Sequence, residues 1–185
     1  IGGGLGIQYR PEDTPPTPQA LLQPIKALLK TRGFSDVKLF VEPGRSIVGN
    51  AGILMTQVQY IKDGDTRNFC IVEGGMNDLI RPALYSAWMD IVPVIERHDV
   101  DPLVVDVVGP VCESSDFLGC ARELAVKPND WLAVLDAGAY GASMASRYNS
   151  RALPMEILVD ADHVIPLRDP ENYEHLVQGE RLLDL

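Results

Sequence analysis

The sequence predicts a short α/β segment followed by a larger, mostly antiparallel β region. Apolar residues recur with the 3.6-residue period of a helix over residues 19–32, and a short apolar run follows at 37–41. A helix followed by such a run is typical of one α/β unit. After that run the apolar period changes to two, as in half-buried strands. We therefore expect two domains, 1–45 and 46–185.

The elements of the first domain can be justified in chain order. An irregular loop is expected over residues 8–18, because it holds four prolines. A helix is expected over 19–32, where leucine and isoleucine residues share one face and Gly33 supplies a stop signal. The strand expected at 37–41 ends on the motif Glu42-Pro43-Gly44-Arg45.

The second domain is expected to be built mainly from β strands. Alternating or apolar composition predicts strands at 53–61, 68–72, 89–97, 103–109 and 131–135. Asp63-Gly64, between the first two of these, is a signal for a hairpin turn. Helices are expected at 142–148 and in the tail at 171–185.

Composition excludes several classes of partner. The 185 residues include 16 Lys+Arg and 26 Asp+Glu, which gives a formal net charge of −10. Nucleic acid and anionic membranes both require a basic surface, so neither is expected as a partner. The apolar stretches are shorter than the roughly 20 residues that span a bilayer, and we expect no transmembrane helix and no signal peptide.

The cysteines favour a reducing compartment, and the cytoplasm is the expected location. Cys70, Cys112 and Cys120 are few, odd in number and without CxxC spacing, which argues against a disulfide scaffold or a zinc site. Cys70 fits an inert buried cysteine, and the role of Cys120 stays undecided. No metal or triad role is assigned to the histidines, which lack partners at ligand spacing: His98, His163 and His175.

Two motifs of the first domain could bind a ligand. The cluster Gly2-Gly3-Gly4-Leu5-Gly6 would let backbone N–H groups approach an anionic oxygen, as in a phosphate cradle. The alternative is a tight turn. Glu42 and Arg45 follow a predicted strand, where α/β folds collect ligand-binding groups. The alternative there is a structural ion pair.

Three motifs of the second domain have similar alternatives. Arg81 and Tyr85 are spaced to hold a carboxylate, although an arginine often simply packs over a tyrosine. Cys112-Glu113 lies on a predicted loop, where the thiol could donate a proton, act as a nucleophile or be inert. Tyr140 precedes a predicted helix and either faces an anion or is buried.

Taken in order, five blocks resemble the diaminopimelate decarboxylase family of alanine-racemase-like (fold type III) pyridoxal-phosphate enzymes. The blocks are GGGLGI within 1–7, EPGR at 42–45, GGMNDLIRPALY at 74–85, GPVCESSDFL at 109–118 and DAGAYGASMASRYN at 136–149. The resemblance extends to about residue 159. It implies the last part of a PLP-binding TIM (β/α)8 barrel followed by a mostly antiparallel Greek-key β-domain.

The resemblance also implies a role for each motif residue. Gly3, Gly4 and Leu5 would bind the cofactor phosphate through their backbone. Glu42 would pair with the pyridinium nitrogen, and Arg45 would contact the phosphate or the substrate. Arg81 and Tyr85 would bind the substrate carboxylate, and Glu113 would bind the distal amino group. Cys112 would deliver the proton to Cα, and Tyr140 would contact the cofactor and the substrate.

The family further implies a homodimer with shared active sites, because its Cys–Glu loop enters the site of the other subunit. In the family, the Schiff-base lysine lies upstream of the glycine loop. The lysines of this chain match no lysine motif of the family: Lys26, Lys30, Lys38, Lys62 and Lys127. We therefore expect the carboxyl-terminal portion of an enzyme, inactive without its amino-terminal part.

The implied activity is the decarboxylation of meso-2,6-diaminopimelate to L-lysine, the last step of lysine biosynthesis, with pyridoxal 5'-phosphate as cofactor. Two alternatives stay open. One is a sister decarboxylase acting on arginine, ornithine or carboxynorspermidine. The other is a non-catalytic homologue that binds or regulates an active relative.

Overall fold

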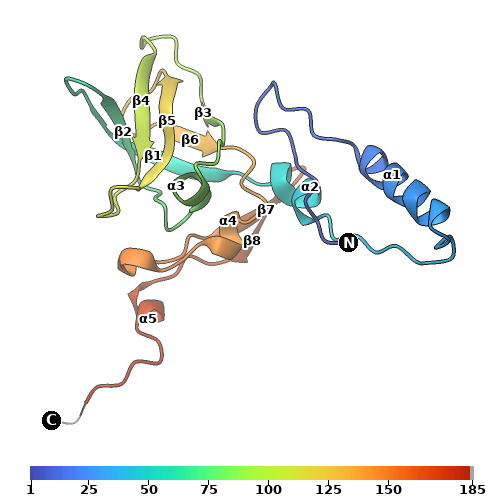
Figure 1. Cartoon of the computed structure of the whole chain (residues 1–185). Helices are drawn as coiled ribbons and strands as arrows, with labels where there is room; N and C mark the ends of the chain where they lie inside the picture. Colours follow the sequence, from blue (N-terminus) through green and yellow to red (C-terminus); the bar gives the residue numbers. More distant parts are fainter. Residues whose placement is uncertain (184–185) are drawn as a thin grey trace.

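A six-stranded sheet forms the body of the protein in the computed structural model, which describes residues 1–183 (Figure 1). The strand order is β3-β6-β1-β2-β4-β5. The strands are β1 (Leu54–Lys62), β2 (Asn68–Val72), β3 (Ile91–Pro93), β4 (Leu103–Val108), β5 (Phe117–Leu124) and β6 (Trp131–Val134). Every neighbouring pair is antiparallel except β2 and β4, so the predicted antiparallel character is confirmed.

The predicted hairpin joins β1 and β2. The two strands pair antiparallel, and the Gly64 N–H donates to the Asn68 side chain at 3.3 Å across the connecting loop. Along β1, Thr56 and Val58 are buried while Met55 and Gln59 are not. This alternation is the period of two from which the strand was predicted.

The sheet curves until its two outer strands lie close together. The Ile91 side chain of β3 sits against Gly119 of β5, where a Cβ would meet both Ile91 and Arg122. The Arg122 side chain also donates to the Met89 carbonyl at 2.8 Å, just before β3. The result is a nearly closed, barrel-like sheet. Its interior is filled by fully buried side chains: Val58, Cys70, Val72, Leu79, Met89, Val107, Leu118, Leu132 and Val134.

The predicted helix at 19–32 is confirmed as α1 (Pro18–Thr31). The Thr17 hydroxyl accepts from the Ala20 N–H at 3.2 Å at its start, and Gly33 has a φ of +79° just after its end. No residue of α1 is buried, and the helix stands apart from the sheet (Figure 1).

The strand predicted at 37–41 is wrong. The segment is not paired with any strand of the described chain, and Val37 and Phe40 are exposed. A strand requires a ladder partner for its N–H and C=O groups, and an apolar run in the sequence does not supply one. Residues 1–45 contain α1 and no strand, so the barrel portion predicted there is not formed within this chain.

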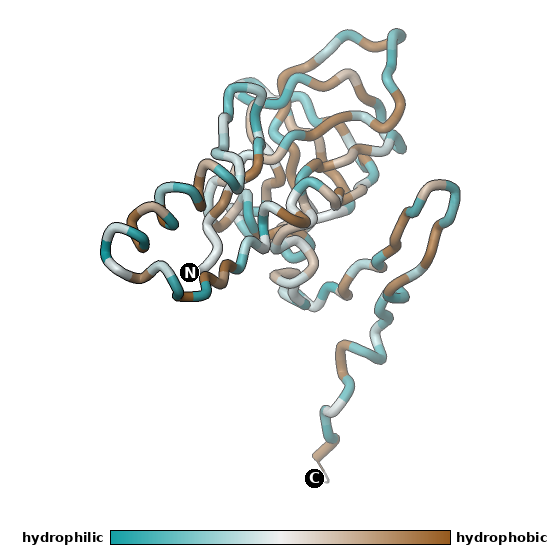
Figure 2. The backbone as a smooth tube through the Cα atoms, turned by 90° about the vertical axis from the view of Figure 1, so that its right-hand side faces the viewer, coloured by the Kyte–Doolittle hydropathy of each residue, from teal (hydrophilic) through white to brown (hydrophobic). Residues whose placement is uncertain are grey.

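Other boundaries differ from the prediction. The strand expected at 89–97 is limited to β3, and three strands were missed: β5, β7 (Glu156–Asp160) and β8 (His163–Arg168). The last two pair as an antiparallel hairpin away from the main sheet, with apolar stretches on both arms (brown in Figure 2).

The helices near the end of the chain are shorter than predicted. The helix expected at 142–148 is α4 (Gly141–Met144), followed by a 3-10 turn at Tyr148–Ser150. The helical tail expected at 171–185 is reduced to α5 (Tyr173–Leu176), and residues 184–185 lie outside the described part. No helix in residues 1–183 combines the length and apolar character needed to cross a membrane.

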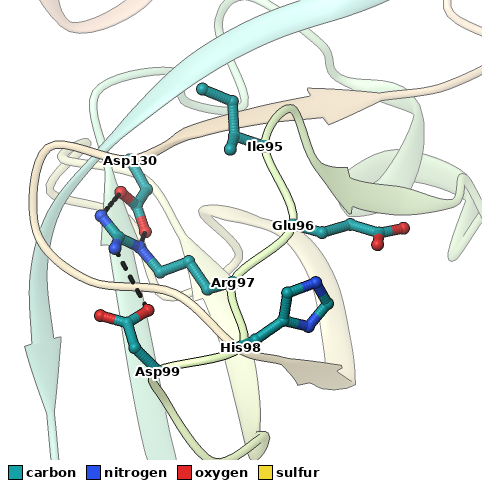
Figure 3. A pocket seen from close by; sticks show the side chains of 6 residues that line it. All are labelled: Ile95, Glu96, Arg97, His98, Asp99 and Asp130. Atoms are coloured by element: carbon teal, nitrogen blue, oxygen red, sulfur yellow. Dashed lines mark hydrogen bonds and ion pairs between the residues drawn. The ribbon is translucent and has the colours of Figure 1, made fainter.

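An open hollow beside the loop after β3 is lined by six residues, of which Arg97, Asp99 and Asp130 pair with one another (Figure 3). Arg97 donates to both Asp130 oxygens at 2.6 Å, and Lys127 donates to Asp99 at 2.8 Å. The Arg97 guanidinium lowers the pKa of Asp130 by hydrogen bonding to it. Because these charges pair with one another, we interpret the hollow as a structural ion-pair network.

Candidate active site

Four of the residues predicted to bind cofactor or substrate line one open pocket of about 390 Å³. Arg45 comes from α2 (Gly44–Val48), Arg81 and Tyr85 come from α3 (Arg81–Tyr85), and Tyr140 precedes α4. The Arg81 guanidinium carbon lies 5.2 Å from the centre of the Tyr140 ring and 5.6 Å from that of Tyr85. Arg45 lies 5.6 Å from the Tyr140 ring. The structure thus brings these four residues together around one pocket.

A close backbone approach brings Arg45 to Tyr140. The N–H groups of Ala137 and Gly138 donate to the carbonyls of Gly52 and Gly49 at 2.8 and 3.0 Å. A Cβ on Gly138 would overlap the Val48 carbonyl, so only glycine permits this contact. The turn that carries Tyr140 is thereby packed directly on α2.

Tyr140 has an unusual backbone conformation, with φ +69° and ψ −5°. A bulky residue in the left-handed region costs about 1–3 kcal/mol and persists only where the surroundings determine it. Such residues concentrate at ligand-binding sites. Its ring is partly exposed, so the alternative of a simply buried tyrosine is not what the structure shows.

The pocket carries positive charge that no described residue neutralises. Arg81 is 8% exposed, its Nε lacks a hydrogen-bond partner, and it is therefore not a surface arginine. Neither Arg45 nor Arg81 forms an ion pair within residues 1–183. Two cations beside one ring repel each other unless an anion lies between them. Phosphate and carboxylate are the groups that guanidinium side chains bind best.

The segment 73–78 between β2 and α3 fixes the start of α3. Gly74 N–H donates to the Thr56 hydroxyl at 2.8 Å, and Gly75 N–H donates to Asp78 Oδ2 at 2.9 Å. The Asn77 amide donates to Asp78 Oδ1 at 2.8 Å. Burial raises the pKa of Asp78. We call this segment the hub, because two further segments are attached to it.

The first segment attached to the hub is the loop with Cys112 and Glu113. The buried Asp116 carboxylate accepts from the Met76 N–H of the hub and from the Val111 N–H, both at 2.6 Å. Asp116 therefore links the loop to the segment that leads into Arg81. Sequence reasoning missed Asp116, although an aspartate closing a Gly-Pro loop was the available signal.

Replacing Asp116 by alanine is expected to lower the free energy of unfolding by about 3 kcal/mol, because the buried Val111 N–H and the partly buried Met76 N–H would both lose a charged acceptor. The measurement is chemical denaturation of the full-length protein followed by near-UV circular dichroism. Asp101→Ala, at an exposed aspartate before β4, is the matched control and should leave stability unchanged. Equal stability of both variants would contradict the anchoring role.

Cys112 and Glu113 do not line the arginine pocket of their own chain. Cys112 is exposed. Glu113 accepts hydrogen bonds from the Tyr148 hydroxyl at 3.2 Å and from the Ser115 hydroxyl at 3.3 Å. The Tyr148 hydrogen bond lowers the pKa of Glu113, so the carboxylate is ionised near neutral pH.

The glycine loop lies beside the Glu42 motif. A Cβ on Gly3 would meet the Glu42 carbonyl oxygen at 2.5 Å, Gly4 has a φ of +101°, and Leu5 is buried. The backbone N–H groups of residues 2–6 donate to no described residue. The Glu42 carboxylate likewise has no described partner, so the structural ion pair with Arg45 is not formed. The loop thus offers free donors and a free carboxylate to a ligand.

No three His, Cys, Asp or Glu side chains in the described range are arranged to hold a metal ion. All three cysteines are free, with Cys70 buried and Cys120 exposed. Burial raises the pKa of Cys70 to about 12, which fits an unreactive core thiol.

A family model described as the C-terminal sheet domain of pyridoxal-dependent decarboxylases matches residues 24–138. That match covers more than half of the chain, and the chain therefore belongs to this family.

Two similar proteins from different bacteria share the name diaminopimelate decarboxylase. The relative from Aquifex aeolicus is 50% identical over 96% of this chain, and the one from Haemophilus influenzae is 48% identical over 95%. In both cases the chain spans 42% of the length of the relative.

Two solved structures share the fold of this chain. A crystal structure from Aquifex aeolicus is 49% identical with a TM-score of 0.91 and covers all of this chain and 45% of its own. Diaminopimelate decarboxylase from M. jannaschii, solved in co-complex with L-lysine, is 38% identical with a TM-score of 0.91 over 98% of this chain and 42% of its own.

Proposed function

We propose that this chain is the carboxyl-terminal part of an enzyme that converts meso-2,6-diaminopimelate to L-lysine and CO₂ with pyridoxal 5'-phosphate. One observation carries the proposal. Arg45, Arg81, Tyr85 and Tyr140 converge on one pocket with uncompensated positive charge, in a chain whose relatives carry that activity in their name.

The residues beside the pocket fit the cofactor. The free N–H groups around Gly3, Gly4 and Leu5 would hold its phosphate, and the free Glu42 carboxylate would pair with its ring nitrogen. Arg45 would contact the phosphate or the substrate, and Tyr140 would face the ring. When bound, the cofactor supplies an electron sink for the carbanion left after CO₂ departs.

The remaining residues would act on the substrate. The Arg81 guanidinium and Tyr85 hydroxyl bind a substrate carboxylate, and the Glu113 carboxylate binds the distal ammonium group. When the bond from Cα to the carboxylate breaks, CO₂ leaves and Cα keeps the electron pair. The Cys112 thiol then gives its proton to Cα.

A homodimer with shared active sites completes this assignment. Cys112 and Glu113 do not line the pocket of their own chain, and the loop that carries them is exposed at both residues. In the dimer this loop would enter the pocket of the second copy. Residues 1–45 would complete a (β/α)8 barrel with an amino-terminal part that contributes the Schiff-base lysine, and residues 46–185 would form the Greek-key β-domain.

The proposed location is the cytoplasm. The three free thiols are compatible with a reducing compartment. A net charge of −10 favours a small amino acid, bound by local arginines, over nucleic acid or an anionic membrane.

The test is to express the full-length protein, load it with pyridoxal phosphate and measure CO₂ and L-lysine released from meso-diaminopimelate. Arginine, ornithine and carboxynorspermidine are supplied separately under the same conditions. Preference for diaminopimelate is the expected result. Preference for another substrate would indicate a sister decarboxylase, and no turnover of any of them would indicate a non-catalytic homologue.

A further inference from the structure

Tyr148 makes the contact that orients Glu113. Its hydroxyl donates to Glu113 Oε2 at 3.2 Å, while the Ser115 hydroxyl donates to Oε1 at 3.3 Å. Both carboxylate oxygens are therefore held by neutral donors. Within residues 1–183 no cation pairs with Glu113, so its negative charge stays available.

The segment that carries Tyr148 is the second one attached to the hub. Ser146 N–H donates to the Asn77 carbonyl at 2.8 Å. Arg151 donates to the Asn77 side chain and to the Glu73 carbonyl, both at 2.8 Å. Between these anchors the backbone reverses through two residues with positive φ, Asn149 at +60° and Ser150 at +56°. Tyr148 is thus presented from a short segment fixed at both ends.

The cation next to Tyr148 in the chain is already neutralised. Arg147 donates to both oxygens of Glu171 at 3.0 and 2.6 Å, and Glu171 also accepts from the Leu153 N–H at 3.0 Å. The Arg147 guanidinium lowers the pKa of Glu171 to about 2, which keeps this pair ionised at neutral pH. The Arg147 charge is therefore engaged by Glu171 and does not compensate Glu113.

We propose that Tyr148 is a positioning residue that holds the Glu113 carboxylate, ionised and free of a cation, for the ammonium group of the substrate. Glu113 and Tyr148 both depend on the hub, through Asp116 and through Asn77 respectively. The hub also leads into α3, so the segment that anchors Tyr148 and Glu113 is continuous with the helix that carries Arg81. A hydroxyl donor suits this role because it orients a carboxylate without neutralising its charge. The inference rests on the proposed function of Glu113.

The experiment is a double-mutant cycle in the full-length enzyme loaded with pyridoxal phosphate. Tyr148→Phe, Glu113→Gln and the double variant are compared for kcat and KM with meso-diaminopimelate, and for L-lysine affinity by calorimetry. Tyr148→Phe should raise KM and the L-lysine Kd about three- to tenfold, with kcat within about twofold, as expected for the loss of one hydrogen bond of typical net strength. In the Glu113→Gln background the same change should have no further effect.

Tyr173→Phe is the control, at a tyrosine that is 84% exposed on α5, and should match the wild type. Unchanged KM and Kd in Tyr148→Phe would overturn the inference. So would an equal rise in KM and Kd when Tyr148→Phe is introduced into the Glu113→Gln variant. If Tyr148→Phe does not fold, Ser115→Ala removes the other hydroxyl that donates to Glu113, and it is compared with Glu113→Gln in the same double-mutant cycle. No turnover by the wild type would instead contradict the proposed function.

Discussion

Replacing Arg81 by alanine in the full-length enzyme is expected to lower kcat/KM for meso-diaminopimelate by about a hundredfold, mainly through a higher KM. A factor of a hundred corresponds to about 2.7 kcal/mol, within the range for a charge-assisted contact made in a buried site. Arg81 is buried, its Nε is unpartnered, and its guanidinium lies between the rings of Tyr85 and Tyr140. Steady-state kinetics with diaminopimelate measures the effect.

Two comparisons show whether the loss belongs to carboxylate binding. Arg81→Lys keeps the charge but lacks the planar fork, so it should recover only part of kcat/KM. Arg67→Ala removes an arginine that is exposed and paired with Asp106, and it should behave as wild type. An unchanged KM in Arg81→Ala would show that another group holds the substrate carboxylate.

The polarity pattern of neighbouring residues was sufficient to predict strands in which polar and apolar residues alternate, or in which all residues are apolar. The bounds of β2 were predicted in full, and those of β1 and β4 to within one residue. The strand β5 was missed because Gly119, Arg122 and Glu123 interrupt its apolar pattern. Its Arg122 is nevertheless buried, since it donates to the Met89 carbonyl and stacks on Trp88 at 3.2 Å from the ring centre. Such tertiary contacts override local pattern.

The false strand at 37–41 has the opposite cause. Its composition is that of a buried strand, but pairing depends on a neighbour that the segment itself does not encode. Arg45, Arg81 and Tyr140 could be proposed as site residues because five sequence blocks, taken together and in order, resemble one family, whereas any one of these motifs alone is a weak signal. Asp116 had a local signal as an aspartate that closes a loop, but its contact with Met76, 40 residues away, was not predictable. Tyr148 was not predictable either, because it acts through Glu113, which lies 35 residues away in the chain.

Replacing Cys112 by alanine is expected to lower kcat by about a hundredfold while KM changes little, because a positioned general acid contributes about 10²–10⁴ in rate. Cys112 is exposed on a loop that Asp116 fixes, and in the proposed dimer its thiol would enter the pocket of the second copy. Cys120→Ala, at another exposed cysteine, is the matched control and should retain full kcat.

The configuration of the labelled product carbon distinguishes a proton-donating Cys112 from a residue that only shapes the loop. In D₂O the wild-type enzyme should place one deuterium on the reacting carbon with a single configuration, because a fixed thiol delivers it from one side. Cys112→Ala should release L-lysine with mixed configuration at that carbon, because solvent can then deliver the proton from either side. Normal kcat and a single configuration in Cys112→Ala would mean that a different residue reprotonates Cα. A low kcat with a single configuration would mean that Cys112 aligns the loop and does not donate the proton.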